Sequence, residues 1–109
     1  MIAHIVLLQP RADLTSQQRD EAIVTLRRTA GSVAEVRRCR LGRRVKHGLP
    51  GYEPLMVHDF EFALIIEFDD VEALKRYLLA PAHAALGELF YTATSSALAY
   101  DYAIEEIDA

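Results

Sequence analysis

A run of strict alternation at residues 58–68 constrains the fold of this chain more than any other segment. Large apolar side chains occupy every second position, and mostly acidic or smaller ones fill the positions between them. Because successive side chains of a strand point to opposite faces of a sheet, the pattern predicts a strand with one wholly apolar face. That face carries Phe60, Phe62, Leu64, Ile66 and Phe68, and the other carries Asp59, Glu61, Ala63, Ile65 and Glu67.

The first half of the chain predicts two more strands and a helix. Residues 2–8 form an apolar run that Pro10 ends, with His4 on the same face as Val6 and Leu8. Thr15 and Gln18 have the spacing of a capping box, which begins a helix, and we expect Gly31 to end it in a left-handed conformation. A basic second strand is expected over residues 33–46, followed by a loop rich in glycine and proline over residues 47–57.

The second half predicts a helix that a proline divides, and a last strand. Asp69 and Glu72 form a second capping-box pattern, and Pro81 interrupts the helix that follows. A further helical segment is expected over 82–93 and a strand over 97–105. The order strand, helix, strand, strand, helix, strand is the ferredoxin-like βαββαβ pattern, an α+β fold with an antiparallel four-stranded sheet. We expect residues 1–109 to form this single domain.

The helices of this fold cover one face of the sheet and leave the other face open. The open face would carry the side chains of Ile5, Leu7, Ala63 and Ile65. An apolar face of that size is rarely left in water. The sequence therefore predicts a homodimer that packs sheet to sheet as a dimeric α/β barrel.

Composition narrows the classes of partner. Twelve Lys and Arg stand against sixteen Asp and Glu, a formal net charge of −4, so the chain as a whole does not attract nucleic acid or anionic membranes. Cys39 is the only cysteine, which excludes an intramolecular disulfide and a cysteine metal cluster. The apolar N-terminal run is too short to span a membrane and lacks the features of a signal peptide. We expect a cytoplasmic protein.

Half of the positive charge lies in one stretch of the second strand. It comprises Arg37, Arg38, Arg40, Arg43, Arg44 and Lys46. A phosphate or RNA site is conceivable, but no aromatic residues interleave with the arginines as stacking platforms would. Cross-strand pairs with Asp59, Glu61 or Glu67 are the favoured interpretation, and steering of an anionic substrate is a lesser one.

Two histidines and a tyrosine are the candidates for chemistry. His83 follows Pro81 at a helix start, where its imidazole could act as a general base near neutral pH. His4 faces the helices, and a buried imidazole needs a polar partner. Tyr77 lies on the inner stripe of its helix, so its hydroxyl would point into a cavity or to a buried acceptor. Each can equally be a packing residue.

The chain resembles the stress-responsive A/B barrel domain family (Dabb). The resemblance covers nearly the whole chain. It rests on Ile2–Leu8, Gly42, Glu67–Asp69, Glu72–Leu74, Tyr77 and Pro81–His83, and only the loop at 47–57 looks extended. Membership implies the α+β barrel dimer.

Within that family the chain is similar to the plant polyketide cyclases that form olivetolic acid. This similarity implies active-site roles for His4, Tyr77 and His83. Two departures reduce the polar set: a pocket tyrosine of the cyclases falls on Leu26, and the usual histidine before the proline is Ala80.

We therefore expect a pocket between sheet and helices. Its apolar wall would be Leu26, Phe62, Leu86 and Phe90, and its catalytic residues His83, His4 and Tyr77. One hypothesis is cofactor-free acid–base chemistry on a small apolar carbonyl compound such as a polyketide or diketone, an aldol-type cyclisation or an isomerisation. The alternative is a non-catalytic stress-response scaffold or ligand-binding protein. A cofactor-free monooxygenase has no residue signature here.

No metal site is predicted. Zinc sites need three or four ligands, and two histidines alone are a weak signal. Asp101, Glu105 and His58 are available, but their spacing gives no sign that they converge on the histidines.

Overall fold

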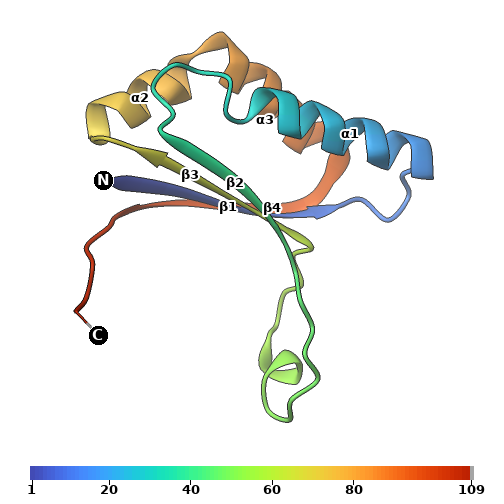
Figure 1. Cartoon of the computed structure of the whole chain (residues 1–109). Helices are drawn as coiled ribbons and strands as arrows, with labels where there is room; N and C mark the ends of the chain where they lie inside the picture. Colours follow the sequence, from blue (N-terminus) through green and yellow to red (C-terminus); the bar gives the residue numbers. More distant parts are fainter. Residues whose placement is uncertain (109) are drawn as a thin grey trace.

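The computed structural model describes residues 1–108 and has helices on one side of a single sheet (Figure 1). The strands are β1 (Ile2–Pro10), β2 (Arg38–Arg43), β3 (Phe62–Phe68) and β4 (Thr94–Ala103), and the helices are α1 (Ser16–Thr29), α2 (Val71–Leu79) and α3 (Pro81–Ala93), with a short 3-10 turn η1 (Glu53–Leu55). The sheet is antiparallel in the order β2-β3-β1-β4. The ferredoxin-like α+β prediction is confirmed, with the second helix divided in two.

The register places the alternating residues of β3 as the sequence predicts. His4 lies opposite Ile66, and Val6 opposite Leu64, in the β1–β3 pairing. Directly opposed residues of antiparallel strands share one face of the sheet. Phe62, Leu64, Ile66 and Phe68 are buried under the helices. They form the core together with Val6, Leu8, Leu26, Ala30, Ala73, Leu74, Tyr77 and Leu86.

Pro81 divides the helical segment as expected. Ala80 is extended, with ψ 147°, because the proline ring disfavours helical backbone in the residue before it. Pro81 then occupies the first turn of α3, where its missing N–H costs nothing. The junction turns the chain so that Tyr77 of α2 and His83 of α3 lie beside each other.

Two expectations about helix ends are wrong. Gly31 is not left-handed, and Ala30 ends α1 with a right-handed backbone. Gly31 instead gives room to Cys39, because a Cβ at residue 31 would lie 3.0 Å from the Cys39 Cβ. The N-cap of α2 is Asp70, whose carboxylate accepts from the Ala73 N–H at 2.8 Å, and not Asp69. Asp69 pairs with Arg37 at 2.7 Å.

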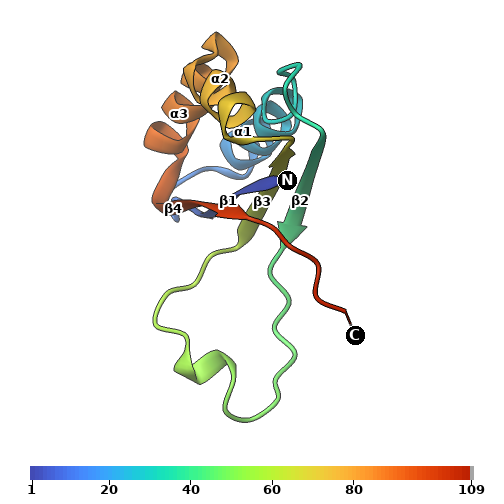
Figure 2. The same ribbon diagram turned by 90° about the vertical axis from the view of Figure 1, so that its left-hand side faces the viewer.

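The strands on either side of the long loop are shorter than expected. β2 spans 38–43 and not 33–46, and β3 begins at residue 62 and not 58. Residues 33–36 form a turn closed by a hydrogen bond from the Val36 N–H to the Val33 carbonyl. Residues 44–61 leave the sheet as a projecting hairpin, which we call the arm (Figure 2).

The basic residues of this region pair with acids, as the sequence analysis favoured. Arg40 lies 3.3 Å from Glu67, and Arg44 lies 2.7 Å from Asp59, both across the β2–β3 pairing or its extension. Glu61 pairs instead with Arg19 of α1. These are surface pairs that contribute little individually. Among residues 1–108, no helix is both long and apolar enough to cross a bilayer.

Candidate functional site

The fold brings His4, Tyr77 and His83 together from three elements. The Tyr77 ring on α2 lies between the two imidazoles, with ring centroids 6.1 Å from His4 on β1 and 5.2 Å from His83 on α3. Both contacts are edge-on, a geometry that aromatic rings favour. Phe68 packs against the same tyrosine at 5.0 Å, which fixes the ring from the sheet side.

The partner of His4 is Asp101, which the sequence analysis did not connect to the histidines. The β1–β4 register sets the two residues directly opposite each other, and Nδ1 of His4 lies 2.5 Å from Oδ1 of Asp101. An ionised carboxylate only accepts hydrogen bonds, so Nδ1 of His4 carries the proton and donates it. Nε2 of neutral His4 is then a free proton acceptor. The signal that could have found Asp101 is the pairing of the first and last strands.

The Tyr77 hydroxyl has a backbone acceptor. It donates to the Ala30 carbonyl at 2.9 Å, and the residue is 1% exposed. Burial, with a smaller contribution from the Cys39 thiol, raises the pKa of Tyr77 to about 12. Of the two expectations for this hydroxyl, a cavity or a buried acceptor, the second holds. The bond ties α2 to the end of α1.

His83 is partly exposed, unlike the other two residues. Desolvation lowers the pKa of His83 below its usual value, and the positive charge that His4 can carry lowers it further. A hydrogen bond with the Leu78 backbone acts in the opposite direction. His83 is therefore neutral at pH 7, as a general base must be.

The strongly apolar cavity of the domain lies away from these three residues. It is lined by α1, α3 and the sheet and is partly open, and its volume is about 20 Å³, room for about one water molecule. Leu26, Phe62 and Phe90, three of the four residues expected to form an apolar substrate wall, line it, but His4, Tyr77 and His83 do not. Leu86 does not, because it is buried in the core. Arg19, paired with Glu61, stands at its edge.

The His4–Asp101 pair is reachable from the side of β4. Asp101 shares the helix-facing side of β4 with Ala97, Ala99 and Ala103, because their register partners on β1 are helix-facing residues. All four are exposed, and the Asp101 side chain is 40% exposed. Small side chains here leave open surface beside His4. A molecule approaching along β4 would meet the carboxylate of Asp101 first.

The described residues give little sign of a metal centre. Within residues 1–108, no three His, Cys, Asp or Glu side chains are placed to hold a metal ion. His4 and Asp101 make a pair, and His83 is separated from His4 by the Tyr77 ring. Imidazole and carboxylate side chains can accept and donate protons, so the arrangement has the functional groups of acid–base chemistry.

Known structures share this fold at low sequence identity. Hydroxynitrile lyase from Passiflora edulis is 18% identical, with a TM-score of 0.80, covering 99% of this chain and 96% of that one. A Dabb family protein with a ferredoxin-like fold from Mesorhizobium loti is 20% identical, with a TM-score of 0.76 and coverage of 96% and 97%. A dimeric ferredoxin-like protein of unknown function from Thermobifida fusca is 19% identical, with a TM-score of 0.73 and coverage of 94% and 90%.

A family model gives the assignment. No curated protein sequence matches the chain, and the structural matches by themselves show only the fold. The model described as the stress responsive A/B barrel domain matches residues 2–104, which is nearly the whole chain. The chain therefore belongs to the stress responsive A/B barrel domain (Dabb) family.

Proposed function

We propose that this domain binds a small apolar carbonyl compound and moves a proton on it without a cofactor. The observation that carries the proposal is the His4–Asp101 pair at 2.5 Å, with a second imidazole, His83, across one tyrosine ring. A carboxylate that holds one nitrogen of an imidazole fixes its tautomer and balances the charge when the other nitrogen takes a proton. The Asp101 side chain is 40% exposed, so the pair lies next to solvent on one side.

His83 is the base in this proposal. It is neutral at pH 7 because burial lowers its pKa, and it is accessible because it is only partly buried. A proton between two carbonyl groups is acidic enough for an imidazole to remove. The electron pair of the broken C–H bond moves onto the neighbouring carbonyl oxygen, and an enolate forms.

His4 stabilises that enolate oxygen. When His4 is protonated, its Nδ1–H donates to Asp101 and its Nε2–H can donate to the developing negative charge. Asp101 is a positioning residue, because it acts through His4. Tyr77 is also a positioning residue, because its hydroxyl donates to the Ala30 carbonyl and its ring lies against both imidazoles. The enolate can then attack a second carbonyl, an aldol-type cyclisation, or take its proton back at another atom, an isomerisation.

An apolar tail of the substrate would have to reach from the histidines to the cavity that lies apart from them. Leu26, Phe62 and Phe90 line that cavity between α1, α3 and the sheet, and Leu86 packs in the core beside them. Its volume of about 20 Å³ holds about one water molecule, so an alkyl chain enters only if α1 and α3 separate. The Passiflora hydroxynitrile lyase shares the fold with this chain and is no evidence for the same reaction.

Binding of a model substrate tests the proposal. An NMR titration of the ¹⁵N-labelled protein with a 1,3-diketone that carries an alkyl tail should shift the signals of His4, His83 and the β4 segment 97–103. His83→Gln should keep binding but lose turnover, and His58→Gln, which changes a histidine outside the site, should keep both. A titration without shifts at these positions would contradict the proposal.

The second candidate function is a non-catalytic scaffold or ligand-binding domain of the stress response. Two observations favour it: Tyr77 is sealed from solvent, and the apolar cavity holds about one water molecule. This candidate predicts that replacing His83 changes neither binding nor turnover of any carbonyl compound.

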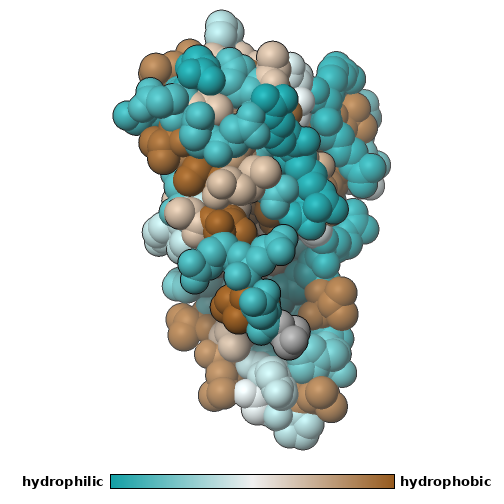
Figure 3. Space-filling model, turned by 60° about the vertical axis from the view of Figure 1, so that its left-hand side comes forward, coloured by the Kyte–Doolittle hydropathy of each residue, from teal (hydrophilic) through white to brown (hydrophobic). Residues whose placement is uncertain are grey.

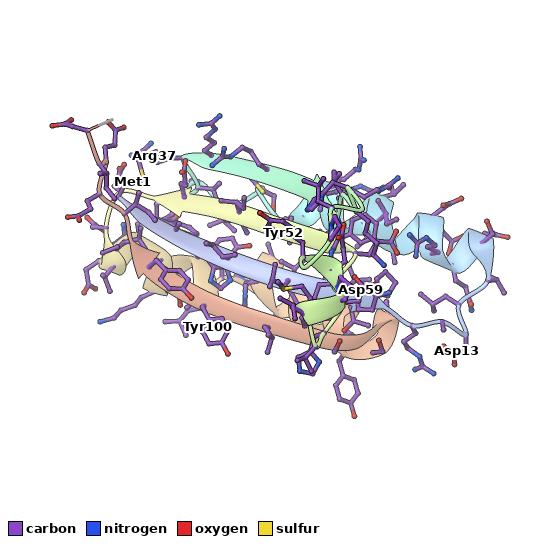
Figure 4. The ribbon with its side chains drawn as sticks, turned by 90° about the horizontal axis from the view of Figure 1, so that it is seen from below. Met1, Asp13, Arg37, Tyr52, Asp59 and Tyr100 are labelled. Atoms are coloured by element: carbon purple, nitrogen blue, oxygen red, sulfur yellow. The ribbon has the colours of Figure 1, made fainter. Side chains whose placement is uncertain are left out.

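We also propose that the domain forms a homodimer through its open sheet face. Ile5, Leu7, Ala63 and Ile65 are only half-buried on that face, and the large side chains of β4 that continue it are exposed. Figure 4 looks onto this face, where Tyr100 of β4 lies uncovered. The Thermobifida protein of the same fold is dimeric. A cytoplasmic location stays a prediction from the sequence.

A further inference from the structure

The arm, residues 44–61, is the part of the molecule that the proposed function does not use. It leaves the sheet between β2 and β3 and extends away from the helices, on the side of the open sheet face (Figures 1 and 2). Apart from η1, it has no regular secondary structure. Its contacts with the rest of the domain lie at its base, where Glu61 pairs with Arg19 of α1, and the part beyond extends into solvent.

Polar contacts hold the arm in shape from within. At its base, the Asp59 carboxylate lies 2.7 Å from Arg44 and 2.8 Å from Lys46. At its tip, the Glu53 carboxylate accepts from the Gly48 N–H at 3.0 Å. Gly48 adopts a φ of 77°, a conformation that other residues rarely accept. An arm that is ordered beforehand loses less conformational entropy when it binds.

The arm nevertheless presents apolar side chains to solvent. Six large ones are exposed: Val45, Leu49, Tyr52, Leu55, Met56 and Val57. Figure 3 shows apolar groups along the lower part of the molecule, interspersed with polar ones. Single exposed apolar residues are ordinary on a protein surface, but a concentration of them on one projecting segment marks an interaction site.

We propose that the arm clasps a second copy of this chain. The inference rests on the sheet-face dimer of the proposed function and identifies a second contact within it. A partner packed on the open face would fill the space beside which the arm projects. The apolar surface of the arm would then continue the apolar surface of that face. In a twofold dimer each contact occurs twice, so both arms close on the opposite subunit.

Charge supports a second copy over a nucleic acid or a membrane surface as the occupant. The arm has two Lys or Arg residues against three Asp or Glu residues, and both basic side chains already lie on the Asp59 carboxylate, so no excess positive charge is left for phosphate groups. What the arm offers to a partner is therefore apolar. The open sheet face of another copy is apolar as well, with Leu98, Tyr100 and Tyr102 exposed on β4.

Sedimentation of matched variants tests the clasp. Leu55→Ser with Val57→Ser removes two apolar groups from the arm, and Leu79→Ser with Tyr91→Ser removes two from the helix layer, where the side chains are at least as exposed as Leu55. A third variant joins Lys46 to His58 through Asn-Gly and so removes the tip. We expect the dimer dissociation constant to rise at least tenfold in both arm variants and to stay unchanged in the helix-layer variant.

The possible results distinguish a failure of the arm contact from a failure of the sheet-face dimer and from a failure of the histidine site. A dimeric wild type with unchanged dissociation constants in both arm variants would overturn the clasp and leave the sheet-face dimer in place. A wild type that is monomeric at every concentration would overturn both. Binding of the 1,3-diketone is measured on the same variants, so failure of the histidine site is recognised independently. Far-UV circular dichroism of each variant shows that a weakened dimer does not come from unfolding.

Discussion

Replacing Tyr77 with phenylalanine separates the structural role of its hydroxyl from a chemical one. The change removes a single oxygen from a residue that is 1% exposed, and it leaves the ring between His4 and His83 in place. It also leaves the Ala30 carbonyl, which accepts from that hydroxyl at 2.9 Å, without this donor in a buried position. We expect Tyr77→Phe to be less stable than wild type and to retain its proton chemistry.

The expected loss follows from that one contact. A buried acceptor that loses its donor costs about 1–3 kcal/mol. For a domain of this size, 1 kcal/mol lowers the melting temperature by about 4 °C, so Tyr77→Phe should melt about 4–12 °C below wild type. The matched control is Tyr91→Phe, because that ring is 88% exposed and its hydroxyl faces water. The control should stay within about 0.5 kcal/mol of wild type.

The same contact should also change how the free energy of unfolding depends on pH in the alkaline range. The pKa of Tyr77 is raised to about 12 by folding, from an ordinary value of 10.0. The folded state therefore holds this proton more tightly than the unfolded state, and the stability it contributes is complete below pH 10 and is lost as pH rises towards 12. Urea unfolding at pH 9 and pH 11 should show wild type losing more stability than Tyr77→Phe. Equal melting temperatures for Tyr77→Phe and Tyr91→Phe would show that the bond from the Tyr77 hydroxyl to the Ala30 carbonyl does not stabilise the fold.

Three further changes test other parts of the structure. His83→Gln should lose less stability in acid than wild type does. Folding lowers the pKa of His83, so its contribution to wild-type stability is present above about pH 6.5 and is lost as pH falls through the lowered pKa. Urea unfolding between pH 7 and pH 5 measures this difference. Gly31→Ala should cost about 1 kcal/mol, because the new Cβ would lie 3.0 Å from that of Cys39, and a gain in melting temperature would contradict this packing. Asp59→Ala breaks two exposed ion pairs and should cost less than about 1 kcal/mol in thermal unfolding; a larger loss would mean that they hold the arm to the domain.

The sequence predicts the fold well wherever burial alternates. The period-two pattern of β3 and the interruption at Pro81 both come from local backbone geometry, so they can be recognised without the rest of the chain. The ends of β2 and β3 could not be predicted in the same way. Residues 44–46 and 58–61 continue the pattern of their strands in the sequence. In the structure β2 and β3 pair only over 38–43 and 62–67, and the two segments leave the sheet beyond that pairing.

The candidate site was predicted in part for a similar reason. His4, Tyr77 and His83 can be placed from helix and strand periodicity and from resemblance to a family. Asp101 could not, because its contact with His4 depends on the register between strands almost a hundred residues apart. The acceptor of the Tyr77 hydroxyl is a backbone carbonyl, which no side-chain pattern reveals.

Deuterium exchange into a 1,3-diketone tests whether the two histidines form a proton-transfer site, because it measures proton removal without assuming the later reaction. In D₂O at pH 7, the wild-type protein should accelerate exchange at the carbon between the carbonyl groups. Asp101→Asn should slow that exchange, and His83→Gln should abolish the acceleration. His58→Gln should match wild type. An exchange rate that is the same with wild type and with His83→Gln would contradict the claim that these histidines form a proton-transfer site.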